Sequence, residues 1–360
     1  MTIVRCLIAG LLAVSLLAQQ EEAPDQVFRA TVNVVTVPVT VTDRDGRYVN
    51  GLQPSNFRLL DNNKPQDIKV DVSFVPISLV VAIQSSWETQ SILPKIRKIG
   101  PLLQGLLTGE QGEIAVLSYA HRIDVLQDFT SDSDSVDAAL EKLKVGASSN
   151  RVIDASMTGI RMLSRRPANR RRILLIIGET RDRSSEGRIR DTLTMAQLEN
   201  VLVYTVNLSR LMATLTAKPQ PPRPDPIPST ARPMPGMVVP TPENARAVSG
   251  LEGTSINFLP LFVEIFRSVK AIFVDNPAEV LTDFTGGREF GFDSIRDLER
   301  AISQIGEEVH SQYIVNYSPN NKVEGGFHEI KVQVFGSTGA QRRDLKVVTR
   351  PGYWLAAVPE

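Results

Sequence analysis

Residues 79–88 read LVVAIQSSWE, and this stretch says most about the architecture of the 360-residue chain. Its first five residues form a continuous apolar run, which is typical of a strand covered on both faces in a parallel sheet. Polar residues begin at Gln84, so the strand is predicted to end there. Because ligands of parallel sheets bind at the carboxyl ends of the strands, residues 84–88 form the first candidate site.

Predicted strands and helices alternate after this stretch. Apolar runs predict strands at 114–119, 123–126, 173–177 and 201–206. Apolar residues spaced by three or four predict helices at 92–106, 136–143, 153–163, 189–198, 258–274 and 295–305, the first of them interrupted by Pro94 and Pro101. This alternation predicts an α/β fold, with a mostly parallel sheet flanked by helices across residues 77–310.

The two ends of the chain carry a different pattern. Valines alternate with polar residues over 32–41, a period of two that predicts a strand, and Asp45-Gly46 then marks a tight turn. Further strands are predicted at 57–60, 68–74, 312–317, 328–334 and 345–348, with the last two joined as a hairpin through 336–339. We therefore expect an N-terminal β segment at 27–75, Ig-like or a sandwich, and C-terminal β strands at 311–355, which together form a smaller all-β portion.

A proline-rich segment at 208–250 interrupts the α/β pattern. Ten prolines fall between Pro219 and Pro242, in a stretch with few large apolar residues. Such a segment cannot pack a core, so it is predicted to be a disordered spacer inserted in the α/β domain. The alternative is a docking arm of the PxxP type.

The composition excludes several classes of function. Lys and Arg together number 40, as do Asp and Glu, so no bulk positive charge favours nucleic acid as a partner. The only cysteine is Cys6, and the chain has three histidines, which excludes a structural zinc site and CxxC redox chemistry.

Residues 1–20 have the pattern of a secretory signal peptide. Arg5 precedes an apolar run at 6–17, and Leu17-Ala18 offers a small-residue cleavage point. The run is too short for a convincing membrane span. We expect an exported protein, periplasmic or extracellular, with no integral membrane span once the signal is cleaved; the alternative is that the signal stays as an anchor.

Several short motifs, in this order, carry a family resemblance. They are Asp43–Val49 with Gly51-Leu52 and Phe57, Asp128-Phe129-Thr130, Thr285-Gly286-Gly287, Gln312-Tyr313, Tyr317-Ser318-Pro319 and Arg350-Pro351-Gly352-Tyr353. From about Phe28 to Tyr353 the chain resembles the secreted bacterial von Willebrand factor A (vWA)-related family that is typical of acidobacteria. The resemblance implies a Rossmann-like vWA domain accompanied by the all-β portion.

The resemblance also implies a metal ion-dependent adhesion site, in a degenerate form. In vWA domains this site uses Asp-x-Ser-x-Ser after the first strand, a Thr from a second loop and an Asp after the fourth strand. Here Gln84 replaces the first Asp, Ser86 is retained and Glu88 replaces the second Ser. Asn150 stands in the Thr position, and Glu179 most closely matches the last Asp.

Two interpretations of this site compete. In the first, Gln84, Ser86 and Asn150 hydrogen-bond one another, the two glutamates face water and no cofactor binds. In the second, Ser86, Glu88, Asn150 and Glu179 hold a weak Ca²⁺ or Mg²⁺ site. We favour the first, because Mg²⁺ requires near-octahedral geometry and longer carboxylate arms rarely preserve it.

Neighbouring residues form a predicted partner-binding edge of Gln84, Trp87 and Arg181. Trp87 is either a hydrophobic recognition residue or cover for the following helix. Arginines also cluster at 165–172 and 181–190, before and after the strand at 173–177. A strand of five residues spans about 17 Å, so these clusters are predicted to be two solvated loops rather than one anion-binding patch.

No catalytic motif stands out. The sequence lacks G-x-S-x-G, H-E-x-x-H and the P-loop pattern, and no histidine is predicted at the carboxyl edge of the sheet. We expect a non-enzymatic module for protein–protein interaction, adhesion or scaffolding, with a protein or cell-surface partner. The alternatives are a cation-dependent adhesion receptor and a cryptic hydrolase.

Overall fold

The computed structural model describes residues 34–71, 75–208, 276–292, 295–321, 326–337 and 339–355. The predicted signal peptide at 1–20 and the predicted helix at 258–274 lie outside these residues, as does the proline-rich segment from residue 209 onward. Within the described part, no helix combines the length and the apolar composition that a membrane span needs.

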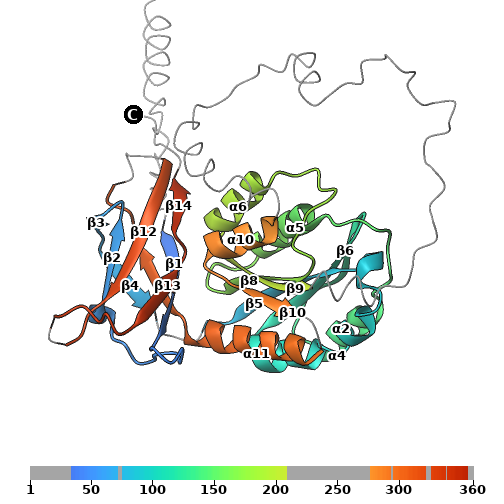
Figure 1. The fold of residues 1–360 in the computed structure, drawn as a ribbon, viewed down its shortest axis with the longest axis horizontal. Coiled ribbons are helices and arrows are strands. Elements are labelled where there is room, and N and C mark those ends of the chain that lie inside the picture. Colours follow the sequence, from blue (N-terminus) through green and yellow to red (C-terminus); the bar gives the residue numbers. More distant parts are fainter. Residues whose placement is uncertain are drawn as a thin grey trace, which may run out of the picture. The chain divides into compact units, whose positions relative to one another are not determined.

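A six-stranded sheet forms the α/β domain (Figure 1). Its strands are β5 (Ile77–Gln84), β6 (Glu113–Tyr119), β7 (Ile123–Thr130), β8 (Arg171–Gly178), β9 (Val201–Leu208) and β10 (Glu289–Phe292). The order is β10-β9-β8-β5-β6-β7, and every pair is parallel except β6 with β7. Numbered along the chain, this is the doubly wound order 3-2-1-4-5-6, so the predicted Rossmann-like fold is confirmed.

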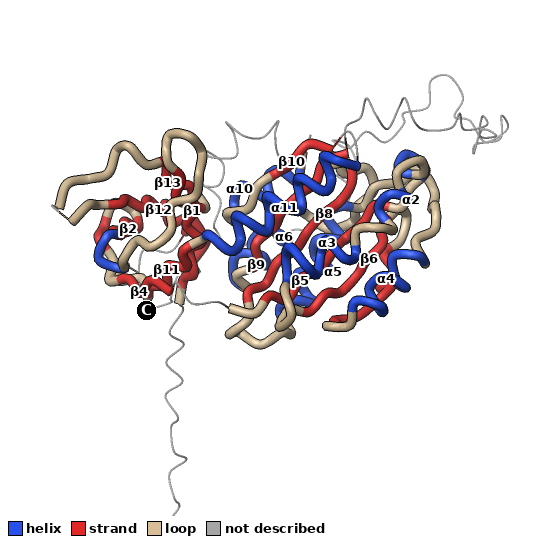
Figure 2. The backbone as a smooth tube through the Cα atoms, turned by 90° about the horizontal axis from the view of Figure 1, so that it is seen from below, coloured by secondary structure: helices blue, strands red, loops and turns tan. Residues whose placement is uncertain are grey.

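Helices cover both faces of this sheet (Figures 1 and 2). On one face lie α5 (Val152–Ser164), α6 (Ile189–Leu198) and α10 (Pro277–Thr285). On the other lie α4 (Ser133–Glu141), α11 (Ile295–Ser311) and the short helices α2 (Leu93–Ile96), α3 (Gly100–Leu102) and η3 (Leu103–Thr108). Side chains of β5 alternate between the two cores, which explains why the strand is apolar throughout.

Prolines divide the segment that was predicted as one interrupted helix. Pro94 and Pro101 stand in the first turns of α2 and α3, where a missing N–H costs nothing. The chain therefore restarts a short helix at each proline.

Two four-stranded antiparallel sheets form the all-β portion. One has the order β13-β1-β11-β4 and the other β14-β12-β2-β3. Their strands are β1 (Val35–Thr42), β2 (Phe57–Asp61), β3 (Lys64–Pro65), β4 (Ile68–Asp71), β11 (Tyr313–Tyr317), β12 (Gly326–Val334), β13 (Lys346–Thr349) and β14 (Gly352–Leu355). Because β1 pairs with both β11 and β13, strands from the two ends of the chain share one core, as predicted.

The predicted hairpin between the last strands is wrong. β12 pairs with β2 and β14, whereas β13 pairs with β1 in the other sheet. The connecting loop does fold back on itself, with an antiparallel bridge between Phe335 and Gln341 and a hydrogen bond from the Arg342 N–H to the Val334 carbonyl, but β12 and β13 continue into different sheets. Alternation of apolar residues identifies a strand but does not identify its partner.

Candidate functional site

Three loops meet at the carboxyl edge of the six-stranded sheet. The first follows β5 at Gln84, the second precedes α5 at Asn150 and the third follows β8 at Gly178. β5 and β8 pair in parallel with Ile83 opposite Ile177, so their ends lie side by side. The structure therefore brings the predicted site residues of all three loops together, at the point where the strand order reverses.

Gln84 links the first and third loops from beneath the surface. Its side chain is fully buried, its amide nitrogen donates to Ser86 Oγ at 2.8 Å and its Oε1 accepts from the Glu179 backbone N–H at 2.6 Å. Both halves of the amide are thus used, which a carboxylate could not reproduce because it has no N–H to donate. Gln84 supports the predicted partner-binding edge but does not reach a partner itself.

Gly178 makes room for this amide. A Cβ at residue 178 would lie 2.6 Å from Gln84 Cβ and 2.7 Å from Gln84 Oε1. Any larger residue would push the Gln84 side chain away from its two partners, so the pairing of Gln84 with Gly178 is a steric fit.

Asn150 fastens the second loop to the third. Its Nδ2 donates to the carbonyl oxygens of Glu179 at 3.1 Å and Arg181 at 2.7 Å. The backbone carbonyl oxygen of Asn150 accepts from the Arg183 backbone N–H at 2.9 Å. Asn150 therefore bonds to backbone groups of the third loop, rather than to Gln84 and Ser86 as the metal-free interpretation supposed.

Arg183 is the central residue that the sequence did not single out. Its Nη1 lies 3.1 Å from Glu88 Oε1, and its Nη2 lies 3.1 Å from Glu179 Oε2. One guanidinium thus bridges the two glutamates that were expected either to face water or to hold a metal. Sequence reasoning missed this because Glu88 and Arg183 are 95 residues apart and nothing in either loop signals the pairing.

Glu88 is held in its charged form by its surroundings. Burial alone would raise its pKa, but hydrogen bonds from Ser148 and Ser86 and the charge of Arg183 outweigh burial and lower the pKa below its ordinary value. Glu88 is therefore ionised at neutral pH and forms a true ion pair with Arg183.

These residues do not fit a directly bound divalent cation. Both glutamates already have a positively charged partner, and Ser86 Oγ accepts the Gln84 N–H. Across the described residues, no group of three or more His, Cys, Asp and Glu side chains is arranged to hold a metal. One feature favours a bound cation: Glu88 Oε2 and Asn150 Oδ1 are buried without a hydrogen-bond partner.

The surface over this ion pair carries Trp87, Arg181 and Arg183. Trp87 is half-buried at the start of a short 3-10 helix (Trp87–Thr89), and Arg181 is exposed. The Arg183 side chain remains 41% exposed while it bridges the glutamates. The loops of this edge therefore expose two arginine side chains and part of a tryptophan ring, which are residue types enriched at protein interfaces.

Three arginines at the opposite end of β8 form ion pairs, whereas the sequence predicted solvated loops there. Arg166 pairs with Glu113 at 2.6 Å and Arg172 with Glu199 at 3.0 Å. Arg170 also contacts Glu113, at 3.2 Å. These three therefore stabilise the fold and do not form a surface anion patch.

Comparisons with known proteins give structural neighbours only. No protein-family model and no curated protein sequence matches the chain. Similar solved structures include the vWF domain of the type V pili tip protein Mfa5 from Porphyromonas gingivalis, with 18% identity, 31% of this chain and 40% of that chain covered, and a TM-score of 0.27. Another is an aerotolerance-related membrane protein from Bacteroides fragilis, with 15% identity and a TM-score of 0.39; the match covers 64% of this chain and 99% of that chain. A third is BatB from Bacteroides thetaiotaomicron, with 13% identity and a TM-score of 0.37; the match covers 64% of this chain and 96% of that chain.

Proposed function

We propose that the chain is an exported, non-enzymatic interaction or scaffold module that binds a protein or cell-surface partner without a metal ion. Binding takes place at the carboxyl edge of the α/β sheet, through Trp87, Arg181 and Arg183. The observation that carries the proposal is the bridge from Arg183 to Glu88 and Glu179. A permanent guanidinium there supplies the positive charge that a vWA domain with an intact site obtains from its metal.

The pairing of both site glutamates with Arg183, rather than the placement of histidine, supports a non-enzymatic role. His328 Nδ1 lies 2.6 Å from Asp61 Oδ1, an arrangement that hydrolases use, but both side chains are fully buried in the sandwich core. His121 is exposed in the β6–β7 turn, and His310 lies in α11. His121 lies at the carboxyl edge, because it follows Tyr119, which pairs with Gln84. The expectation that no histidine stands at this edge is therefore wrong. The two carboxylates of the site, Glu88 and Glu179, are both held by Arg183.

Export rests on residues 1–20 alone. Their charged, apolar and small-residue regions follow the order of a signal peptide. A cleaved signal would leave a mature chain without cysteine, whose stability in an oxidising compartment depends on core packing.

The test is capture of partners from envelope extracts on the immobilised mature protein, with and without EDTA. We expect the same partner in both conditions, loss of that partner with Trp87→Ala or Arg181→Glu, and no loss with Arg161→Glu, an exposed control on α5. The proposal would be overturned if EDTA abolished capture of the partner and added Mg²⁺ restored it.

A second candidate function is a cation-dependent adhesion receptor. The two unpartnered buried oxygens, Glu88 Oε2 and Asn150 Oδ1, favour it, because oxygens of this kind are what Ca²⁺ and Mg²⁺ bind. In that case Arg183 has to swing away when the cation enters. Partner capture would then depend on the cation, and Arg183→Ala would strengthen it.

A further inference from the structure

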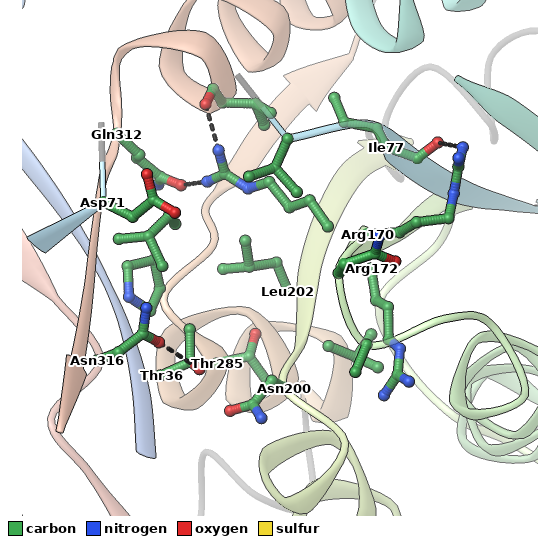
Figure 3. A pocket seen from close by; sticks show the side chains of 18 of the residues that line it. Thr36, Asp71, Ile77, Arg170, Arg172, Asn200, Leu202, Thr285, Gln312 and Asn316 are labelled. Atoms are coloured by element: carbon green, nitrogen blue, oxygen red, sulfur yellow. Dashed lines mark hydrogen bonds between the residues drawn. The ribbon is translucent and has the colours of Figure 1, made fainter. Parts of the chain in front are cut away.

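A cavity of about 540 Å³ lies at the other end of the sheet, away from the candidate site. Its walls come from the first residues of β5, β8 and β9 and from β1 and β11 (Figure 3). Figure 3 shows Gln312 and Asn316 on one side, Asn200 below and Leu202 between them. The volume is that of a typical small-molecule site, which measures roughly 300–1,000 Å³.

Arg350 brings an uncompensated charge to this wall. Its side chain is buried, its Nε has no hydrogen-bond partner and it forms no ion pair with any described carboxylate. Its guanidinium carbon lies 5.6 Å from the centre of the Tyr353 ring. Burial lowers the pKa of Arg350 to about 10, which still leaves it protonated at neutral pH. Buried charges are normally paired, so a single unpaired guanidinium indicates a missing anion.

Arg171 adds a second buried guanidinium to the same wall. It donates to the Val309 carbonyl and to Gln312 Oε1, and its Nε has no partner. It too lacks an ion pair with a described carboxylate. By contrast, Arg170 and Arg172 in the same wall are already neutralised by Glu113 and Glu199.

The remaining lining limits the charge and size of the ligand. Asp71 also lines the cavity, so a dianion such as phosphate would meet an added negative charge there. Ile77, Leu202 and Ile314 provide apolar surface between the polar groups. A single negative charge attached to a hydrocarbon body matches this combination.

We propose that this cavity binds a small organic monocarboxylate. Its carboxylate pairs with the Arg350 guanidinium group, and its hydrocarbon part lies against Leu202 and Ile77. This inference is independent of the proposed function, because the two sites stand at opposite ends of the strands.

The test uses the mature protein and straight-chain carboxylates from butanoate to decanoate, with benzoate, by calorimetry and thermal shift. We expect at least one to bind at or below roughly 1 mM and to raise the melting temperature, while its uncharged amide and inorganic phosphate do not. Arg350→Met should weaken binding by about tenfold or more, and the exposed control Arg161→Met should not change it.

A second variant covers the case in which Arg350→Met does not fold. Ala168 lies in an exposed turn that lines the cavity, so Ala168→Trp narrows it without disturbing the core. We expect this variant to fold and to lose carboxylate binding. The proposal is overturned if no carboxylate binds, if the amides or phosphate bind as well as the acids, or if neither variant weakens binding.

Discussion

Arg183 donates through Nη2 to a carboxylate oxygen of Glu179 at 3.1 Å, which places a fixed positive charge beside a nearly buried carboxylate. The same guanidinium reaches Glu88 through Nη1 at 3.1 Å. In the vWA family that the sequence resembles, a metal ion supplies this charge. The bridge therefore pairs both glutamates of this edge with one positive charge.

Gln84→Glu should destabilise the protein. The new carboxylate cannot donate to Ser86 and is placed beside the backbone of Glu179, so a buried hydrogen bond is lost and a like charge is added. We expect a loss of about 1–3 kcal/mol in the free energy of unfolding, measured in urea. Gln341→Glu, at an exposed position, is the control, and an equal effect of the two changes would contradict the supporting role of Gln84.

Gly178→Ala should cost stability through overpacking. The added methyl would lie 2.6 Å from both Gln84 Cβ and Tyr119 Oη, in a buried region that cannot give way easily. We expect a loss of about 1–3 kcal/mol, seen as a lower melting temperature. Gly105→Ala, which meets nothing within 4 Å, should be nearly neutral. An unchanged melting temperature for Gly178→Ala would show that the side chains around Gly178 are packed less tightly than described.

Asp61 should make the stability of the sandwich depend on pH. Its buried carboxylate accepts from Tyr317 and Tyr353 at 2.8 Å each and lies 2.6 Å from His328 Nδ1. Burial alone would raise the pKa of Asp61, but these hydrogen bonds and one from Asn321 outweigh burial and lower the pKa below its ordinary value of 3.8.

Because the folded pKa is the lower one, the unfolded chain binds a proton first on acidification. The contribution of Asp61 is therefore fully present above pH 3.8 and is lost as the pH falls through the folded pKa. Asp61→Asn should cost about 3 kcal/mol at neutral pH and should flatten the acid limb of the stability curve. Urea denaturation from neutral to acidic pH measures both, and parallel curves for wild type and variant would refute the assignment.

The strands of the candidate site could be predicted, because the reason for them is local. The continuous apolar run before Gln84 requires burial on both faces, and parallel strands bring their carboxyl ends to one edge. The position of Arg183 could not be predicted. It depends on how two loops, 95 residues apart, fold over each other, and no spacing rule describes that.

One missed strand and one wrong strand pairing have a similar cause. β10, only four residues long, was missed because it is too short to show a period, although Phe290 is buried. β12 and β13 were recognised as strands, but their sheets were assigned from closeness in sequence. Pairing across the sandwich depends on contacts between the two ends of the chain.

Arg183→Ala should have two effects. Removing the guanidinium leaves Glu88 and Glu179 unpaired, and we expect a loss of about 1 kcal/mol, kept small because the arginine is 41% exposed and solvent screens its charge. The variant should also gain affinity for Ca²⁺ or Mn²⁺, because two carboxylates are released. Arg188→Ala, at an exposed position in the same loop, is the control and should do neither.

Calorimetric titration of the mature wild-type protein with Mg²⁺, Ca²⁺ and Mn²⁺ tests the metal-free site most directly. With Arg183 bridging Glu88 and Glu179, we predict no binding heat up to roughly 10 mM of any of the three ions. Binding at millimolar or lower concentration that Glu179→Ala abolishes would contradict it.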